Sequence, residues 1–205
     1  MALDDQPRNE VALLRQPAIV ALLTALIYGV AAMPALARGE IDASGLGYLQ
    51  AGTISMTIAL AAILIALSTI DMLTFELPDV LTLPLAGAGV LLHALSDWTT
   101  GIYHFLAAAA AFAFLAGLAN LYQFARGRAG LGLGDAKLLA ATGAWLGFAA
   151  LPSVLLLAAG SGLASVAVAR LRYGALALSD AIPFGPYLAF AMWLVWLYGP
   201  LFANG

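Results

Sequence analysis

The sequence predicts an all-α membrane protein, a bundle of helices that crosses the bilayer several times. Of its 205 residues, 63% are hydrophobic and only 9% are charged, whereas soluble domains average about 45–50% apolar and about 25% charged residues. The mean hydropathy of +0.98 agrees with this class. So few charged side chains cannot cover the surface of a fold in water. The composition therefore excludes a soluble globule, a disordered chain and a nucleic-acid-binding protein.

The apolar segments predict about seven spanning helices, because a span needs about 20 mostly apolar residues, with about 17–25 tolerated. The third and fifth segments are short by this measure, and a count of six to eight stays open. We expect residues 1–16 to form a tail and residues 17–205 to form one transmembrane domain. The seven segments are 17–37, 51–70, 80–95, 102–124, 135–149, 152–169 and 184–202.

The residues beside each segment indicate where it begins and ends. The first span follows a polar tail, and its apolar run is too long for a cleavable signal. Asp71 directly follows the second, and Asp79 before the third suits a helix N-cap, which accepts hydrogen bonds from free backbone N–H groups. The alanines at 107–111 let the fourth helix pack closely in lipid. The fifth and sixth segments meet at Pro152, and the last begins at a proline-rich break over residues 183–186.

The basic residues predict the orientation of the chain. If the N-terminus lies in the cytoplasm, seven of the eight Lys and Arg residues fall at the inner face and only Arg38 falls outside. Cytoplasmic loops of membrane proteins carry such an excess of Lys and Arg. The seven are Arg8, Arg15, Arg126, Arg128, Lys137, Arg170 and Arg172. The loops near residues 71–79, 125–135 and 170–183 are therefore expected on the cytoplasmic side.

Several acidic residues lie near the cytoplasmic membrane face, where an ionisable group raises a functional hypothesis. Asp71 follows an apolar run, and an acid at a helix C-terminus opposes the helix macrodipole, unless the helix has already reached water. Asp79 is explained as an N-cap. Asp135 suits an N-cap too, with Lys137 as an anchor at the membrane surface or a neutraliser of local charge. Glu76 is either a solvated loop residue or a substrate contact.

Glycines precede Asp135 at alternate positions, 130, 132 and 134. This spacing disfavours a helix, and irregular backbone near the membrane survives only where protein or a wet cavity supports it. The Lys-Ser/Thr ending of a phosphate-binding loop is absent. Because the chain has no cysteine and only two histidines, His93 and His104, we expect neither a metal nor a cofactor.

Three motifs together resemble the type IV prepilin peptidase family, the membrane aspartic peptidases of the GxGD type. They are Asp71 with Leu-Pro-Asp at 77–79, Gly-Leu-Gly-Asp-Ala-Lys at 132–137 and Pro-Phe-Gly-Pro at 183–186. The resemblance extends over residues 50–190. It implies a multi-pass protein of the bacterial inner membrane that cleaves the short basic leader from prepilin or pseudopilin precursors at the cytoplasmic face. The catalytic pair carried over from the family is Asp71 and Asp135.

The resemblance also assigns supporting residues and one departure. Many family members carry a cytoplasmic insert with cysteine pairs and also methylate the new N-terminus. This cysteine-free sequence is similar to a short, peptidase-only form, so we expect no N-methyltransferase activity. Residues expected to bind substrate or support the loops of the site are Gly132, Gly134, Lys137, Glu76, Pro183 and Gly185.

Two carboxyl groups suffice for peptide hydrolysis without a nucleophile or metal if one is charged and the other neutral. Asp135 begins a helix and Asp71 ends one, so the macrodipole predicts that Asp135 is the more acidic of the two. A proton- or cation-coupled transporter or channel using the same acids is the main alternative, although no acid falls within an apolar segment core. A non-catalytic scaffold and another GxGD protease, of the signal-peptide or presenilin kind, are further alternatives.

Overall fold

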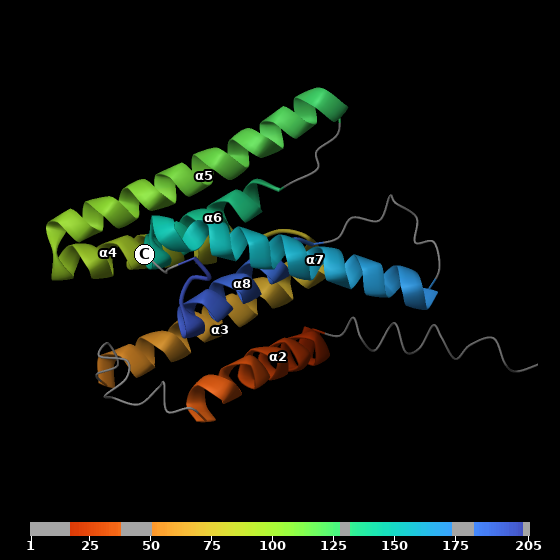
Figure 1. Cartoon of the computed structure of the whole chain (residues 1–205), viewed down its shortest axis with the longest axis horizontal. Coiled ribbons are helices and arrows are strands. Elements are labelled where there is room, and N and C mark those ends of the chain that lie inside the picture. The colour runs from red at the N-terminus through yellow and green to blue at the C-terminus, as the bar shows by residue number, and fades with distance from the viewer. Residues whose placement is uncertain (1–16, 38–50, 128–131, 174–182, 203–205) are drawn as a thin grey trace, which may run out of the picture.

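The computed structural model describes residues 17–37, 51–127, 132–173 and 183–202, and these form a bundle of α-helices (Figure 1). The predicted all-α fold is confirmed, and each of the seven predicted segments contains a helix. The predicted tail, residues 1–16, lies outside the described residues. The helices are α2 (Pro17–Ala37), α3 (Ala51–Thr74), α4 (Asp79–Ser96), α5 (Trp98–Arg126), α6 (Leu133–Leu146), α7 (Leu151–Tyr173) and α8 (Gly185–Tyr198).

Several helix ends differ from those expected. Helix α3 continues to Thr74, so Asp71 lies in its last turn rather than beyond it. The predicted N-cap role of Asp79 is wrong, because Pro78 precedes the first helical residue and no side chain caps α4. The fifth and sixth segments remain separate, because Gly147, at φ 74°, ends α6 and a short 3-10 helix, η1 (Phe148–Ala150), leads into α7.

The helices divide into five long ones and two short ones among the described residues. Five contain stretches long and apolar enough to cross a membrane, within α2, α3, α4, α5 and the η1–α7 segment. Helices α6 and α8 have 14 residues each, which at about 1.5 Å per residue gives about 21 Å, short of the roughly 30 Å hydrocarbon core. Most of α6 and half of α8 are buried by neighbouring helices. These two helices are therefore interior elements rather than full spans.

Helices α4, α5 and α6 form one tightly packed group. A Cβ atom added at Gly89 of α4 would lie 2.6 Å from the Trp145 side chain, and one added at Gly143 of α6 would lie 2.7 Å from the carbonyl oxygen of Ala107. The Trp145 indole N–H also donates a hydrogen bond to the Leu85 carbonyl oxygen at 2.8 Å. Gly89 and Gly143 therefore let the helix backbones touch, and the α5 residue that Gly143 approaches, Ala107, belongs to the alanine run predicted to allow close packing.

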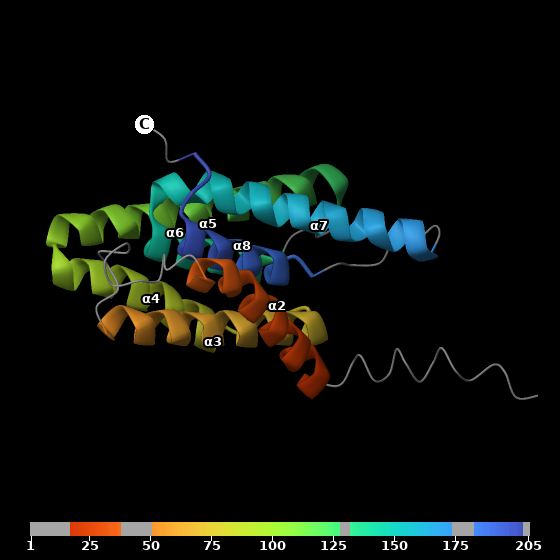
Figure 2. The same cartoon turned by 60° about the horizontal axis from the view of Figure 1, so that its bottom comes forward.

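Helices α2, α3, α7 and α8 form the second group, which lies against the first (Figures 1 and 2). Polar side chains link its members: the hydroxyls of Tyr28 and Ser68 lie 3.1 Å apart, and those of Ser165 and Tyr187 lie 2.6 Å apart. The Trp193 indole N–H donates to the Tyr28 carbonyl oxygen at 3.2 Å. Asp71 belongs to this second group and Asp135 to the first, so the seam between the groups separates the two predicted catalytic residues.

Phe75 ends α3 in a strained conformation. Its φ of 58° lies in the left-handed region, while its N–H still donates to the carbonyl oxygen of Asp71 at 2.9 Å. A residue with a Cβ pays about 1–2 kcal/mol for this conformation and glycine does not. The side chain is 55% exposed, so little burial offsets the strain.

The strain at Phe75 predicts an order of stability for two variants. Phe75→Gly should be more stable than Phe75→Ala by about 1 kcal/mol, since both lose the ring and only glycine relieves the backbone. Unfolding of both variants in the same detergent measures the difference. Equal stability, or a more stable alanine variant, would show that the backbone at Phe75 is not strained.

Candidate active site

Asp71 is a buried carboxyl group in the last turn of α3. Its side chain is 3% exposed, and its Oδ2 atom has no hydrogen-bond partner among the described residues. The first residue of α8, Gly185, lies directly against it, because a Cβ added there would be 2.6 Å from Oδ2 and 3.0 Å from Cγ. Only glycine fits at this position, so the backbone at the start of α8 packs directly against the Asp71 carboxyl group.

Asp135 is the second buried carboxyl group, in the first turn of α6. It is 7% exposed, and its backbone N–H donates to the Gly132 carbonyl oxygen at 3.2 Å. Burial, and next the negative charge of Asp71, raise the pKa of Asp135 to about 7. The two carboxyl groups are thus close enough to interact electrostatically, although 64 positions separate them in the sequence.

The raised pKa of Asp135 differs from what the helix macrodipole predicts. The N-terminus of α6 favours the carboxylate, but desolvation and the nearby like charge favour the neutral acid and outweigh it. When two acids interact in this way, the proton belongs to the pair rather than to one residue. Asp71 and Asp135 can therefore share one proton near neutral pH.

One side chain, Leu77, joins the three sequence motifs. A Cβ added at Gly134 would lie 3.1 Å from Leu77 Cβ, and one added at Gly185 would lie 3.0 Å from Leu77 Cδ1. Leu77 lies in the connection between α3 and α4 and is partly buried. The Leu-Pro-Asp motif is visible in the sequence, but this role of its leucine is not. The signal was the presence of glycine in both partner motifs, which leaves room for a neighbouring side chain.

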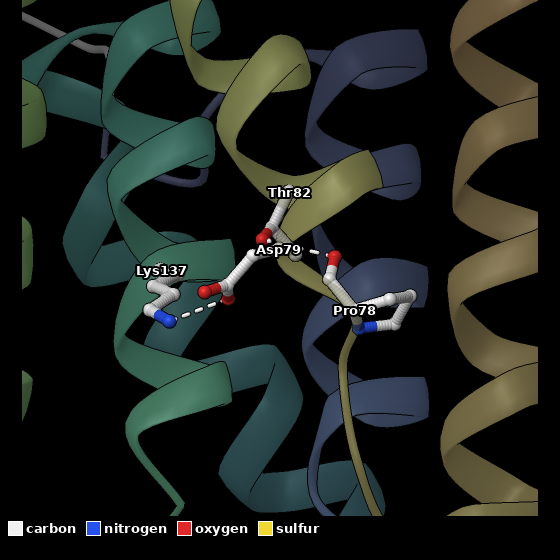
Figure 3. Close-up of polar contacts among 4 residues, drawn as sticks. All are labelled: Pro78, Asp79, Thr82 and Lys137. Carbon is white, nitrogen blue, oxygen red and sulfur yellow. Dashed lines mark hydrogen bonds and ion pairs between the residues drawn. The ribbon is translucent and has the colours of Figure 1, made fainter.

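Lys137 lies beside the site but pairs with Asp79 rather than with the buried carboxyl groups (Figure 3). Its Nζ atom is 2.5 Å from Asp79 Oδ1, and the side chains are 27% and 55% exposed. An exposed ion pair of this kind contributes about 0–1 kcal/mol. The pair connects the first turn of α6 to the start of α4, where the Thr82 hydroxyl donates to the Pro78 carbonyl oxygen at 3.3 Å.

The remaining predicted residues surround this site. Gly132 precedes α6 as its N-cap residue, and Pro183 lies half-buried before α8. Glu76 is exposed, and its backbone N–H donates to the Thr74 hydroxyl at 3.3 Å. The substrate-binding roles of these residues stay predictions. Among the described residues no cluster of three or more His, Cys, Asp or Glu residues could hold a metal ion.

The fold and the site thus define a multi-helix membrane protein that buries two neighbouring carboxyl groups from different helices. The profile of the type IV leader peptidase family matches residues 58–168, which include Asp71 and Asp135. The chain belongs to this family.

Curated relatives agree with this assignment. A prepilin leader peptidase/N-methyltransferase of Burkholderia pseudomallei (strain K96243) is 42% identical over 155 residues, covering 75% of this chain and 50% of that protein. Proteins of the same name from Aeromonas hydrophila and Neisseria gonorrhoeae are 39% and 32% identical, covering 88% and 86% of this chain and 58% and 56% of their own lengths. The chain thus spans about half the length of these relatives. No solved structure matches it.

The interaction between the two carboxyl groups predicts how Asp135 titrates. Asp71→Asn removes the neighbouring negative charge but leaves Asp135 buried, so the pKa of Asp135 should fall from about 7 while staying above its ordinary value. Infrared titration of the protonated carboxyl band measures this shift, and loss of the band in Asp135→Asn assigns it. An unchanged pKa in Asp71→Asn would show that the two groups do not interact.

Proposed function

We propose that the protein is a membrane aspartic endopeptidase that removes the short basic leader from prepilin or pseudopilin precursors at the cytoplasmic face of the bacterial inner membrane. The observation that carries the proposal is the pair of buried carboxyl groups, Asp71 and Asp135, held within electrostatic range at one end of the bundle. Membership of the leader peptidase family supports the same reaction.

The pair has the chemistry that amide hydrolysis needs. One carboxylate takes a proton from water as the oxygen attacks the peptide carbonyl, and the partner carboxyl group donates its proton to the leaving amine. The proton taken from water replaces the one donated, so the pair ends the cycle with one proton as it began. The raised pKa of Asp135 supports this mechanism, because it keeps that shared proton available near neutral pH.

The Asp71 Oδ2 atom, which has no hydrogen-bond partner in the part of the chain that the structure describes, supports a role in binding the reacting groups. A buried acceptor without a partner costs about 1–3 kcal/mol, and stable folds rarely keep one. A water molecule or a peptide N–H at Asp71 Oδ2 would satisfy it.

The helix directions support one membrane face for the site. Helix α3 ends, and helices α4, α6 and α8 begin, at the end of the bundle where α2 starts (Figure 1). Lys137 and the exposed Arg170, near the end of α7, lie toward this end. Because Lys and Arg concentrate on the cytoplasmic side, we assign this end to the cytoplasm. A precursor with an apolar helix would lie in the bilayer beside it.

The proposal predicts that cleavage depends on both carboxyl groups. Asp71→Asn and Asp135→Asn should each slow cleavage of a prepilin-like precursor by about 100- to 10,000-fold. Asp97→Asn should stay within about threefold of the parent, because Asp97 caps α5 and asparagine caps a helix about equally well. A size shift of the precursor on gels, at matched membrane levels of each variant, measures the rates. Near-parental cleavage by either of the first two variants would contradict the two-carboxyl mechanism. Proton or cation flux in proteoliposomes without cleavage would favour the transporter instead.

The packing of the α8 backbone against Asp71 gives a second prediction. Gly185→Ala places a Cβ 2.6 Å from Asp71 Oδ2, and a displacement of about 1 Å at a reacting group costs about 100-fold in rate. We expect a loss of that size, with normal membrane insertion. Gly162→Ala is the matched control, because its Cβ would make an ordinary 3.7 Å contact with Tyr187. Equal rates for the two variants would show that Gly185 does not shape the site.

A further inference from the structure

An apolar cavity lies between helices α2, α3 and α8, close to Asp71. Its volume is about 190 Å³. For scale, an apolar cavity of about 150 Å³ in another protein is large enough to bind benzene. The cavity therefore has room for one bulky apolar side chain. The residues that line it include Ile27 and Tyr28 of α2, Ser68 and Met72 of α3, and Pro186 and Phe190 of α8.

The cavity borders the candidate active site on the side of Asp71. Met72 is the residue after Asp71, and Ser68 lies one helical turn before it. Pro186 follows Gly185, whose backbone lies against the Asp71 carboxyl group. Because an extended peptide advances about 3.3–3.6 Å per residue, a chain bound at the carboxyl pair would present a side chain to the cavity within a few residues of the bond to be cleaved.

The polar groups around the cavity are already paired. The Tyr28 hydroxyl bonds to Ser68, and the Thr24 hydroxyl donates to the Val20 carbonyl oxygen at 2.8 Å. The Tyr187 hydroxyl bonds to Ser165. A charged or strongly polar side chain would lose its water in the cavity without gaining partners, so the cavity favours an apolar one.

The rim of the cavity opens on the outer surface of the bundle. Ile27 is 55% exposed and Met72 is 48% exposed, and both lie within helices long and apolar enough to cross the membrane. This surface therefore faces lipid. Methionine is also flexible enough to adapt to side chains of different shape. A group entering here would come from the bilayer, as the apolar helix of a membrane-bound precursor would.

We propose that the α2–α3–α8 cavity is a substrate subsite that takes one bulky apolar side chain of the precursor, from the start of its apolar helix and within a few residues of the cleaved bond. This inference rests on the proposed peptidase function. It adds a requirement on the substrate, because a precursor with a small or charged residue at that position would leave the cavity unfilled or force a charge into it.

The absence of cysteine from the chain allows a direct test by crosslinking. Ile27→Cys, in the Asp135→Asn background that retains the substrate, is oxidised with prepilin-like precursors that carry single cysteines along the start of the apolar helix. Leu156→Cys on α7 is the matched control, because Leu156 does not line the cavity and is also 55% exposed. We expect a disulfide from Ile27→Cys at one or two precursor positions, at least fivefold above the control. Equal or no crosslinking would overturn the subsite.

A cleavage measurement tests the same subsite without crosslinking. Met72→Trp narrows the rim, so kcat/KM should fall at least tenfold more for a precursor with Phe at the crosslinked position than for one with Ala there. The control Leu91→Trp, at a 57% exposed position on α4, should lower both equally. Equal losses for both precursors with Met72→Trp would also overturn the subsite. If the parent protein cleaves the precursor while these results are negative, only the subsite fails; if the parent does not cleave it, the proposed function fails first.

Discussion

The contact of Leu77 with Gly134 and Gly185 is the constraint on which the candidate site depends. Asp71 and Asp135 belong to different helix groups, so nothing within either group fixes the distance between them. Leu77 fills the seam where the groups meet, and the two glycines let the backbones of α6 and α8 close around it. The carboxyl pair is therefore a product of packing between the groups, and three motifs far apart in the sequence are needed to make it.

The placement of Lys137 explains why the pair can keep a proton. A lysine beside Asp135 would stabilise the carboxylate and lower the pKa of that group. Lys137 instead pairs with Asp79 on the outer side of the same helix turn, where both side chains are partly exposed. Burial and the charge of Asp71 are left to raise the pKa of Asp135. The Lys137 ammonium group thus links α6 to α4 through Asp79 and does not pair with Asp71 or Asp135.

The sequence predicted the helices well and the contacts at their ends poorly. Composition and apolar runs determine which segments lie in the membrane, so the class and order of the helices followed directly. The N-cap prediction for Asp79 failed because Pro78 holds the N-cap position and Asp79 is the first helical residue. Its carboxylate pairs instead with Lys137, 58 positions away. The macrodipole of its own helix predicted a low pKa for Asp135. Its pKa is raised instead, because other helices bury the carboxyl group. The role of Leu77 has no local signal in the sequence, since it depends on glycines in two distant motifs.

The division into two helix groups has a consequence for how the surrounding lipid acts on the protein. Spanning helices adjust to bilayers of different thickness by tilting. Because one carboxyl group is carried by each group, a change in relative tilt would alter their separation, and the repulsion between like charges varies inversely with distance. The proton affinity of the pair would then depend on the thickness of the host membrane as well as on pH.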